Sequence, residues 1–250
     1  MIFSLITIVT FPTSTVGAEH PVKINIISKK SSENEEIRDG GLINNSQFTD
    51  EQVRAVYDAC IDAGIDYMEI GYKNSHEQFP KDTYGPWRHC DEEDIRRVVG
   101  DHSFEATGLK LCAMADAGGK SDWKSQIIPA KDSVLDMIRV ACYVHQISEA
   151  AEMVQHCHDL GYETTFNIMA ISIVKELELD QALQIVAKSP ANAIVVVDSF
   201  GNLFREQVNF LVKKYTDAVA ELDVLKDVQN PSPQQRQEIE TKTEEVAKLR

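Results

Sequence analysis

The chain has 250 residues and a formal net charge of −15, with 40 acidic against 25 basic side chains. Nucleic acid and anionic membrane are thereby excluded as main partners, because both are bound through a basic surface. A hydrophobic fraction of 43% excludes general disorder and leaves room for one large domain or two small ones.

The N-terminus begins with a short apolar run over residues 2–11, followed by small residues at 15–18. The run is too short to span a bilayer. No Lys or Arg precedes it, so the charged region that opens a signal peptide is missing. We therefore expect an irregular extension over residues 1–21 on a cytoplasmic protein. Secretion or organellar import, with this segment cleaved, is the alternative.

The cysteines are odd in number, widely spaced and without a C-x-x-C pair. This pattern favours neither a disulfide framework nor a structural zinc site. We expect reduced and mostly buried thiols, at Cys60, Cys90, Cys112, Cys142 and Cys157.

The first predicted elements are a strand over 22–27 and a helix that begins after Thr49. Thr49 and Gln52 have the spacing of a capping box. Apolar residues recur at helical spacing between 53 and 61, and Gly64 ends the helix. A polar and charged link over 28–37 comes directly after the predicted strand, so that strand does not run straight into residue 38.

From residue 65 onward, predicted strands and helices alternate. The strands are expected at 65–72, 108–116, 134–142, 162–171 and 191–199. The helices between and after them are expected at 91–99, 148–160, 176–187 and 206–220. Long loops over 74–90 and 117–129 interrupt the series. Such alternation predicts an α/β fold built on a parallel sheet.

The composition changes after about residue 217, and Asn230-Pro231-Ser232-Pro233 breaks the chain. Residues 234–250 are highly charged and predict a solvated helix, with a weak coiled-coil seam as the alternative. We therefore divide the chain into an N-terminal extension (1–21), a (β/α) domain (22–220) and a charged helical tail (221–250).

Several predicted strands carry polar residues where a sheet covered on both faces should be apolar. Glu69 lies within the strand 65–72, where it shares a face with Tyr67 and Gly71. Further polar residues of this kind are Lys110 and Asp116, which share a face of the strand 108–116, and Arg139, Asn167 and Asp198. Each could be an isolated structural ion pair or a strand end facing solvent. Together they favour convergence inside a barrel, near the strand ends where barrels hold their chemistry.

Arg38 and Asp39 lie side by side before Gly40 and Gly41, which predicts a glycine turn. Ionised groups inside a protein need partners or a metal. The Arg-Asp pair, together with a Glu inside an apolar strand, therefore predicts a metal-binding active site on a barrel.

At this point the chain resembles a known family, the DRE-type metal-dependent TIM barrels. These include HMG-CoA lyase, isopropylmalate and homocitrate synthases and 4-hydroxy-2-oxovalerate aldolase. The chain is most similar to bacterial aldolase-like members with an R-D-G-G variant. The resemblance covers roughly residues 37–216 and rests on Ile37-Arg-Asp-Gly-Gly-Leu-Ile-Asn-Asn45, Asp66-Tyr-Met-Glu-Ile-Gly-Tyr72, Ile138-Arg-Val-Ala-Cys142, Phe166-Asn-Ile-Met169 and Val197-Asp-Ser-Phe-Gly201.

The resemblance implies roles for individual residues. Asp39 would ligate a divalent metal, Mg²⁺ or Mn²⁺, which prefers carboxylate oxygen. Arg38 would stabilise an enolate oxygen, and Glu69 would hold Arg38 in place. The residues implied to line the pocket and contact substrate are Arg139, Asn167 and Asp198.

The chain also departs from the family. The family completes its metal site with His-x-His on a later strand, and none follows Tyr215. Leu42 stands where the aldolases carry a histidine base. His156-Cys157-His158 falls in a predicted helix, where residues i and i+2 point apart. We therefore expect a TIM (β/α)8-type barrel that is incomplete, with about six βα units.

The leading hypothesis is a carbon–carbon lyase, or aldolase-like enzyme, acting on a 2-oxo acid or acyl thioester through a metal-stabilised enolate. The alternative is a catalytically inactive, truncated barrel that acts through protein association, with the charged C-terminal helix as its contact. An open barrel leaves edge strands unpaired, so a homodimer is also expected.

Overall fold

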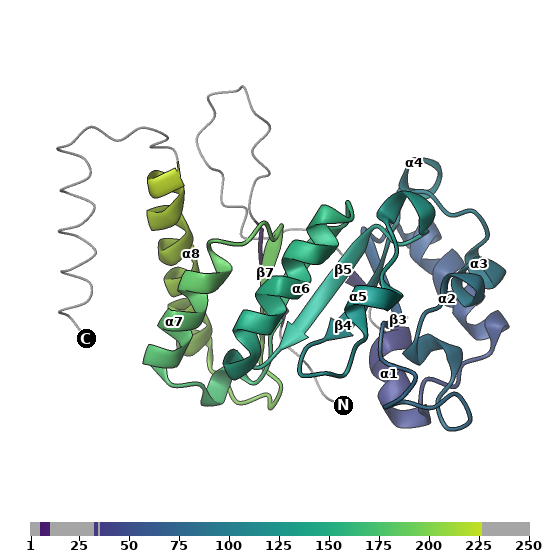
Figure 1. Cartoon of the computed structure of the whole chain (residues 1–250), viewed down its shortest axis with the longest axis horizontal. Helices are drawn as coiled ribbons and strands as arrows, with labels where there is room; N and C mark the ends of the chain where they lie inside the picture. The colour runs from purple at the N-terminus through teal and green to yellow at the C-terminus, as the bar shows by residue number, and fades with distance from the viewer. Residues whose placement is uncertain (1–5, 11–32, 35, 227–250) are drawn as a thin grey trace.

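The computed structural model describes residues 6–10, 33–34 and 36–226 (Figure 1). Its centre is a seven-stranded sheet in the order β1-β7-β6-β5-β4-β3-β2. Neighbouring strands from β2 to β7 are parallel, and β1 pairs antiparallel with β7. Strands and helices alternate along the chain, which is the α/β arrangement with a parallel sheet that the sequence predicts.

The strands of this sheet are β1 (Ile6–Thr10), β2 (Glu33–Asn34), β3 (Tyr67–Tyr72), β4 (Lys110–Asp116), β5 (Met137–Cys142), β6 (Glu163–Ile168) and β7 (Ala193–Val197). The α-helices are α1 (Glu36–Asn44), α2 (Asp50–Ala63), α3 (Glu92–Val99), α4 (Phe104–Thr107), α5 (Trp123–Gln126), α6 (Ile147–Asp159), α7 (Glu176–Val186) and α8 (Arg205–Lys226). The 3₁₀ turns are η1 (Pro86–Arg88), η2 (Ala130–Asp132), η3 (Val144–Gln146) and η4 (Ile171–Ile173).

The limits of α2 follow from its sequence. The Thr49 side chain accepts a hydrogen bond from the Gln52 backbone, and the Gln52 side chain accepts one from the Thr49 backbone. At the other end, Gly64 adopts φ 65° and closes the helix in the left-handed conformation that glycine tolerates. The predicted capping box and glycine end are both confirmed.

The two faces of the sheet differ in chemistry. One face packs against the helices and belongs to the main apolar core, through residues such as Met68, Leu111, Ile138, Phe166 and Ile194. In Figure 1, α6 lies across β5 and β6 on this side. The other face, which we call the inner face, carries the polar side chains together with Met114 and Ala141. Polar groups on separate strands are therefore collected on one side of the sheet.

A β-bulge changes the alternation of β3. Glu69 pairs with Cys112 and Gly71 with the next residue of β4, Ala113, so Ile70 is the extra residue. Strict alternation predicted that Gly71 shares a face with Glu69, and this was wrong. The bulge moves Gly71 to the helix side and turns Tyr72 to the inner face, beside Met114. Bulges of this kind commonly lie next to functional sites.

The five strands predicted after Arg38 are all present, each shorter than predicted. The helices predicted near 91–99, 148–160, 176–187 and 206–220 correspond to α3, α6, α7 and α8. Two short helices, α4 and α5, lie in stretches that the sequence did not mark as helical. Four-residue helices leave too weak a periodicity to be recognised.

The N-terminal expectations need correction. Residues 6–10, inside the stretch expected to be irregular, form β1. All five are β-branched, and such residues favour a strand wherever an edge such as that of β7 is available. The strand expected at 22–27 and the tail helix at 234–250 lie outside the described residues. Instead, β2 at Glu33–Asn34 pairs with β3 just before Arg38.

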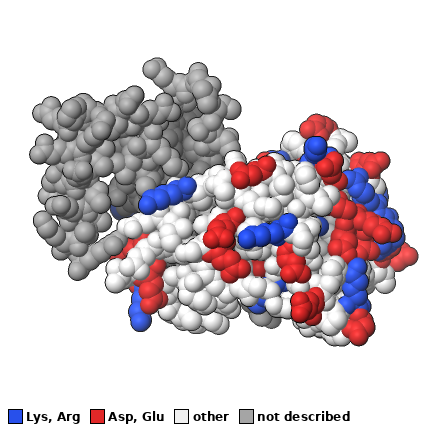
Figure 2. Space-filling view, in the orientation of Figure 1, with Lys and Arg blue, Asp and Glu red and all other residues white. Residues whose placement is uncertain are grey.

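The surface over α2 and α3 carries acidic and basic side chains close together (Figure 2). Arg97 pairs with Asp50 and Asp94, and Arg96 pairs with Asp101. These pairs are exposed, so each contributes at most about 1 kcal/mol. Of these pairs, only Arg97–Asp50 joins α2 to α3.

All five cysteines are buried, as predicted. Within the described ranges, no helix combines the length and the apolar character needed to cross a membrane.

Candidate active site

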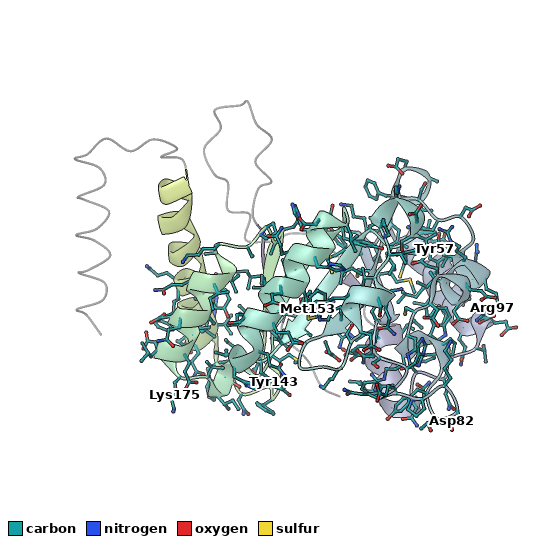
Figure 3. The ribbon with its side chains drawn as sticks, viewed as in Figure 1. Tyr57, Asp82, Arg97, Tyr143, Met153 and Lys175 are labelled. Carbon is teal, nitrogen blue, oxygen red and sulfur yellow. The ribbon has the colours of Figure 1, made fainter. Side chains whose placement is uncertain are left out.

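The candidate site lies where the parallel strands end. The loops that follow β3, β5 and β6 are marked in Figure 3 by Asp82, Tyr143 and Lys175, along the lower edge of the view. Parallel strands bring their carboxyl ends to a common edge, and α/β proteins hold their ligands there. Arg38 enters this region from α1, which follows β2.

Glu69 is the centre of the site. Its side chain is fully buried, and its Oε2 atom accepts a hydrogen bond from Arg38 Nε. The same oxygen lies 3.0 Å from Nη1 of Arg139, which is buried on β5 two strands away. The side chains of β4 that face this gap are Cys112 and Met114, which leave Arg139 room to reach across. One carboxylate thus links two arginines from different elements.

Asp39 lies beside this pair. Its Oδ1 accepts a hydrogen bond from Arg38 Nη1, and 46% of its side chain is exposed. The prediction of a glycine turn here was wrong, because Arg38 to Gly41 lie inside α1. Glycine is needed for space rather than for a turn. A Cβ on Gly41 would lie 2.8 Å from Ser46 Oγ, and one on Gly40 would lie 3.1 Å from the Phe48 ring.

The carboxylates around Asp39 do not form the ligand set of the divalent metal that the resemblance implies. Nowhere in the described ranges do three His, Cys, Asp or Glu side chains come together as metal ligands. Asp39 offers one carboxylate, and the Glu69 carboxylate already accepts from Arg38 and lies against Arg139. The described residues therefore do not fit a complete metal site, and we derive no chemical step through a metal.

The His-x-His sequence at 156–158 belongs to no group of three His, Cys, Asp or Glu side chains in the part of the chain that the structure describes. His156 lies in α6 with its ring against Trp123 at 5.2 Å, and His158 on the same helix faces solvent. Leu42 lies near the end of α1 and is 57% exposed. Its side chain has no group that could act as a base.

Asn167 and Asp198 are placed differently. Asn167 is buried on the inner face of β6 and accepts a hydrogen bond of 2.7 Å from Thr165, whose register partner on β5 is Arg139. Asp198 follows β7, and its Oδ2 accepts from the backbone N–H of Leu203 at 2.7 Å. Burial alone would raise the pKa of Asp198, but backbone donors, led by Leu203, lower it. Asn167 thus lies on the inner face, while Asp198 stabilises the loop that follows β7.

Asp116, at the end of β4, was among the polar strand residues noted in the sequence, but it was given no role there. It is 9% exposed, and Asn74 Nδ2 lies 3.4 Å from its Oδ2. Burial raises the pKa of Asp116, and the positive charges of Lys120, Arg88 and Arg38 offset only part of this. A buried carboxyl that holds its proton more tightly than usual is a candidate proton carrier.

Tyr72 also reaches this region through the bulge. Burial raises the pKa of Tyr72 to about 12, and Arg38 works against that shift. The sequence signal for these residues was present: Tyr72-Lys73-Asn74-Ser75 is a polar run directly after an apolar strand. From the sequence, Tyr72 was placed at the end of a strand and Asn74 at the start of a loop, and neither residue was given a role in the site.

The raised pKa of Asp116 gives a pH prediction. The folded state binds the Asp116 proton more tightly than the unfolded state does, so this group lowers stability as the pH rises above about 4. Asp116→Asn removes that effect and keeps an acceptor for Asn74. Urea unfolding should show the variant gaining stability relative to the wild type between pH 4 and pH 8. A stability difference that stays constant over this range would contradict the raised pKa.

A cavity of about 370 Å³ lies at the opposite, amino ends of the strands. Its lining includes His102, Asp136, Lys110 and Glu163. Lys110 is paired with Glu163, and the Asp136 carboxylate accepts from the Leu111 backbone at 2.8 Å. Because the charged groups satisfy one another, we place the candidate site at the carboxyl ends instead.

No family model matches the chain. Curated proteins do. The chain is 31% identical over 179 residues to 4-hydroxy-2-oxovalerate aldolase 3 of Rhodococcus jostii (strain RHA1), which covers 69% of this chain and 49% of that protein. It is 28% identical over 197 residues to 4-hydroxy-2-oxovalerate aldolase of Bacillus thuringiensis (strain Al Hakam), with 77% and 52% covered. The chain thus spans about half the length of these relatives. The chain joins Arg38, Glu69 and Arg139 at the inner face of a parallel sheet. In sequence, it is similar to 4-hydroxy-2-oxovalerate aldolases.

Proposed function

We propose that the chain is an aldolase-type carbon–carbon lyase that acts on a 4-hydroxy-2-oxo acid, and that it belongs to the DRE-type family. The observation that carries the proposal is the buried Glu69 carboxylate between Arg38 and Arg139. Similarity to aldolases over 179 residues supports it and favours a 2-oxo acid over an acyl thioester. The sheet would be part of a TIM-type barrel, with its inner face lining the interior of that barrel.

The chemistry needs an oxyanion partner and a proton acceptor. In the proposed cleavage, the 4-hydroxyl proton passes to a base, the O–H electrons form the aldehyde carbonyl, and the C3–C4 bond electrons form the enolate of pyruvate. The negative charge develops on the C2 oxygen, where a fixed guanidinium stabilises it. Arg38 fits this role because Glu69 and Asp39 fix its orientation. A proton then returns to C3, which gives pyruvate.

Asp116 is the proton acceptor in this proposal. It stands at the end of β4, near enough to Arg38 for that charge to offset part of the rise in its pKa. The position of the aldolase histidine is Leu42 in this chain, so another base is required. Arg139 and Asn167 would shape the inner wall on which the substrate rests.

The resemblance also implies Mg²⁺ or Mn²⁺ at Asp39. The described residues supply only Asp39 toward it, so the activity assay is run with and without added Mn²⁺.

The test is pyruvate release from 4-hydroxy-2-oxovalerate, followed with lactate dehydrogenase and NADH. Arg38→Met should lower kcat/KM by about 100-fold, the usual size of losing one oxyanion donor. Arg54→Met is the matched control, since Arg54 also pairs with an aspartate and lies over a tyrosine ring but stands on the exposed face of α2. Its activity should equal that of the wild type.

Wild-type protein that releases no pyruvate under either condition would overturn the proposed function. The alternative, an inactive barrel that acts through association, would then be the better interpretation. Equal losses in both arginine variants would instead show that Arg38 acts on the fold alone.

A further inference from the structure

Arg88 stands next to the candidate site and has an unusual environment. It ends η1, and its guanidinium carbon lies 4.7 Å from the ring centres of Tyr72 and Phe79 and 5.2 Å from that of Tyr84. Arg88 is 9% exposed. Three aromatic rings thus hold one cation at the carboxyl end of β3, and we call this group the arginine box. Aromatic faces attract a guanidinium and fix its plane.

The arginine box lacks a carboxylate. Among the described side chains, none forms an ion pair with Arg88, and its buried Nε has no hydrogen-bond partner. Buried polar atoms normally have partners, so an exception needs an explanation. The Oδ1 atom of Asn74, whose backbone N–H donates to Arg88 O, is also buried without a partner. Both groups point to a ligand that brings its own acceptors and donors.

The charges of the neighbouring groups show why Arg88 is distinct. Arg38 and Arg139 contact Glu69, and Arg38 also contacts Asp39. Their charges already face carboxylates. Tyr72 lies between the two arginine groups, because its ring contacts Arg88 and the charge of Arg38 opposes the rise in its pKa. Arg88 and Lys120 are the other cations whose charge reaches the buried Asp116, and a substrate whose reacting oxygen lies at Arg38 would meet Arg88 beyond the Tyr72 ring.

The backbone holds this group rigidly. Trp87 is fully buried and its Nε1 donates to the Phe48 carbonyl at 3.2 Å. The Asn74 N–H donates to Arg88 O at 3.1 Å, and the Gly85 N–H donates to Asn45 O at 2.9 Å. A cation fixed in advance binds an anion with less loss of side-chain entropy.

We propose that Arg88 binds the carboxylate of the substrate, so that the site takes small 2-oxo acids with a free carboxylate and discriminates against their neutral esters. This rests on the proposed function for the identity of the substrate. Arg38 stabilises the negative charge that develops on the carbonyl oxygen, and Arg88 binds the permanent negative charge of the carboxylate at C1. A guanidinium recognises a carboxylate through paired, charge-assisted hydrogen bonds.

The experiment compares pyruvate with methyl pyruvate, which has the same 2-oxo group but no charge. Ligand-observed NMR on the full chain gives both dissociation constants. The wild type should bind pyruvate about 10-fold or more tightly than the ester, as expected for a hydrogen-bonded charge. In Arg88→Met this preference should disappear through weaker pyruvate binding, with ester binding unchanged. Arg88→Lys should keep part of the preference, and Arg54→Met should keep all of it.

If Arg88 had only a structural role, Arg88→Met would weaken the binding of pyruvate and of methyl pyruvate equally. The ratio of the two dissociation constants is therefore the informative quantity. Equal binding of the two ligands by the wild type would overturn the proposal without any variant, even if Arg88→Met does not fold. A preference that survives in a folded Arg88→Met protein would also overturn it.

The two proposals can fail separately. An active wild type whose Arg88→Met variant keeps its KM would leave the lyase and remove the role of Arg88. An inactive wild type that loses its preference for pyruvate in Arg88→Met would keep the carboxylate site and remove the lyase.

Discussion

Glu69→Ala should lower the free energy of unfolding by about 3–5 kcal/mol, the usual cost of removing one partner of a buried ion pair. The glutamate is fully buried, and its loss leaves the two arginines that it contacts, Arg38 and Arg139, without their shared carboxylate. Urea unfolding at pH 7 measures the change. Kinetic assays should show pyruvate release falling as well, because Arg38 loses the group that fixes it.

The control is Glu163→Ala. Glu163 also pairs with a cation, Lys110, and accepts from Tyr67, but 34% of its side chain is exposed. Solvent screens such a pair, so its loss should cost at most about 1 kcal/mol. Glu69→Gln separates charge from shape, since it keeps the size of the side chain. Similar losses in Glu69→Ala and Glu163→Ala would show that the buried pair has no special weight.

Gly71→Ala should destabilise the fold by about 3 kcal/mol, the upper range for overpacking, even though it adds one methyl group. A Cβ at Gly71 would lie 2.1 Å from the Trp87 carbonyl oxygen and 2.6 Å from Cys90 Sγ. The first of these is backbone, so the strand and η1 must separate. That movement displaces Arg88 from the end of β3, and the preference for pyruvate over its methyl ester should fall too.

Gly108→Ala is the matched comparison. Gly108 has φ 70° but no heavy atom within 4 Å of a Cβ, so its substitution costs only the left-handed strain of about 1–2 kcal/mol. Thermal or urea unfolding of the two variants shows whether steric overlap at Gly71 costs more stability than backbone strain at Gly108. If Gly71→Ala were no less stable than Gly108→Ala, the close contact between β3 and η1 would be unimportant.

The regular part of the fold could be predicted because its signals are local. The capping box at Thr49 and the apolar runs at β4 to β7 depend on residues close together in the chain. The helical state of Arg38 to Gly41 could not be predicted, since two glycines disfavour a helix unless packing requires them. Here Phe48 and Ser46 lie against those glycines, and that contact appears only in three dimensions.

The site was predictable in part for the same reason. A Glu in an apolar strand is visible as an exception, and its partner Arg38 follows from the family resemblance. Arg88 lies in a loop with ordinary composition, and its environment needs a ring from β3 and two from a folded loop. The bulge that turns Tyr72 inward is equally invisible, because a one-residue register change leaves no compositional mark.

The antiparallel strand β1 has a consequence for how the chain is made. Ile6 pairs with Val197, so β1 finds its partner only after all the strands between them have been synthesised. Contacts between such distant segments form slowly, because a long loop must close before any pairing is gained. Until then the edge of β7 is open to other chains. The yield of folded protein should therefore depend on how fast β1 docks once β7 has been synthesised, so this edge is where folding in the cell is most easily diverted into aggregation.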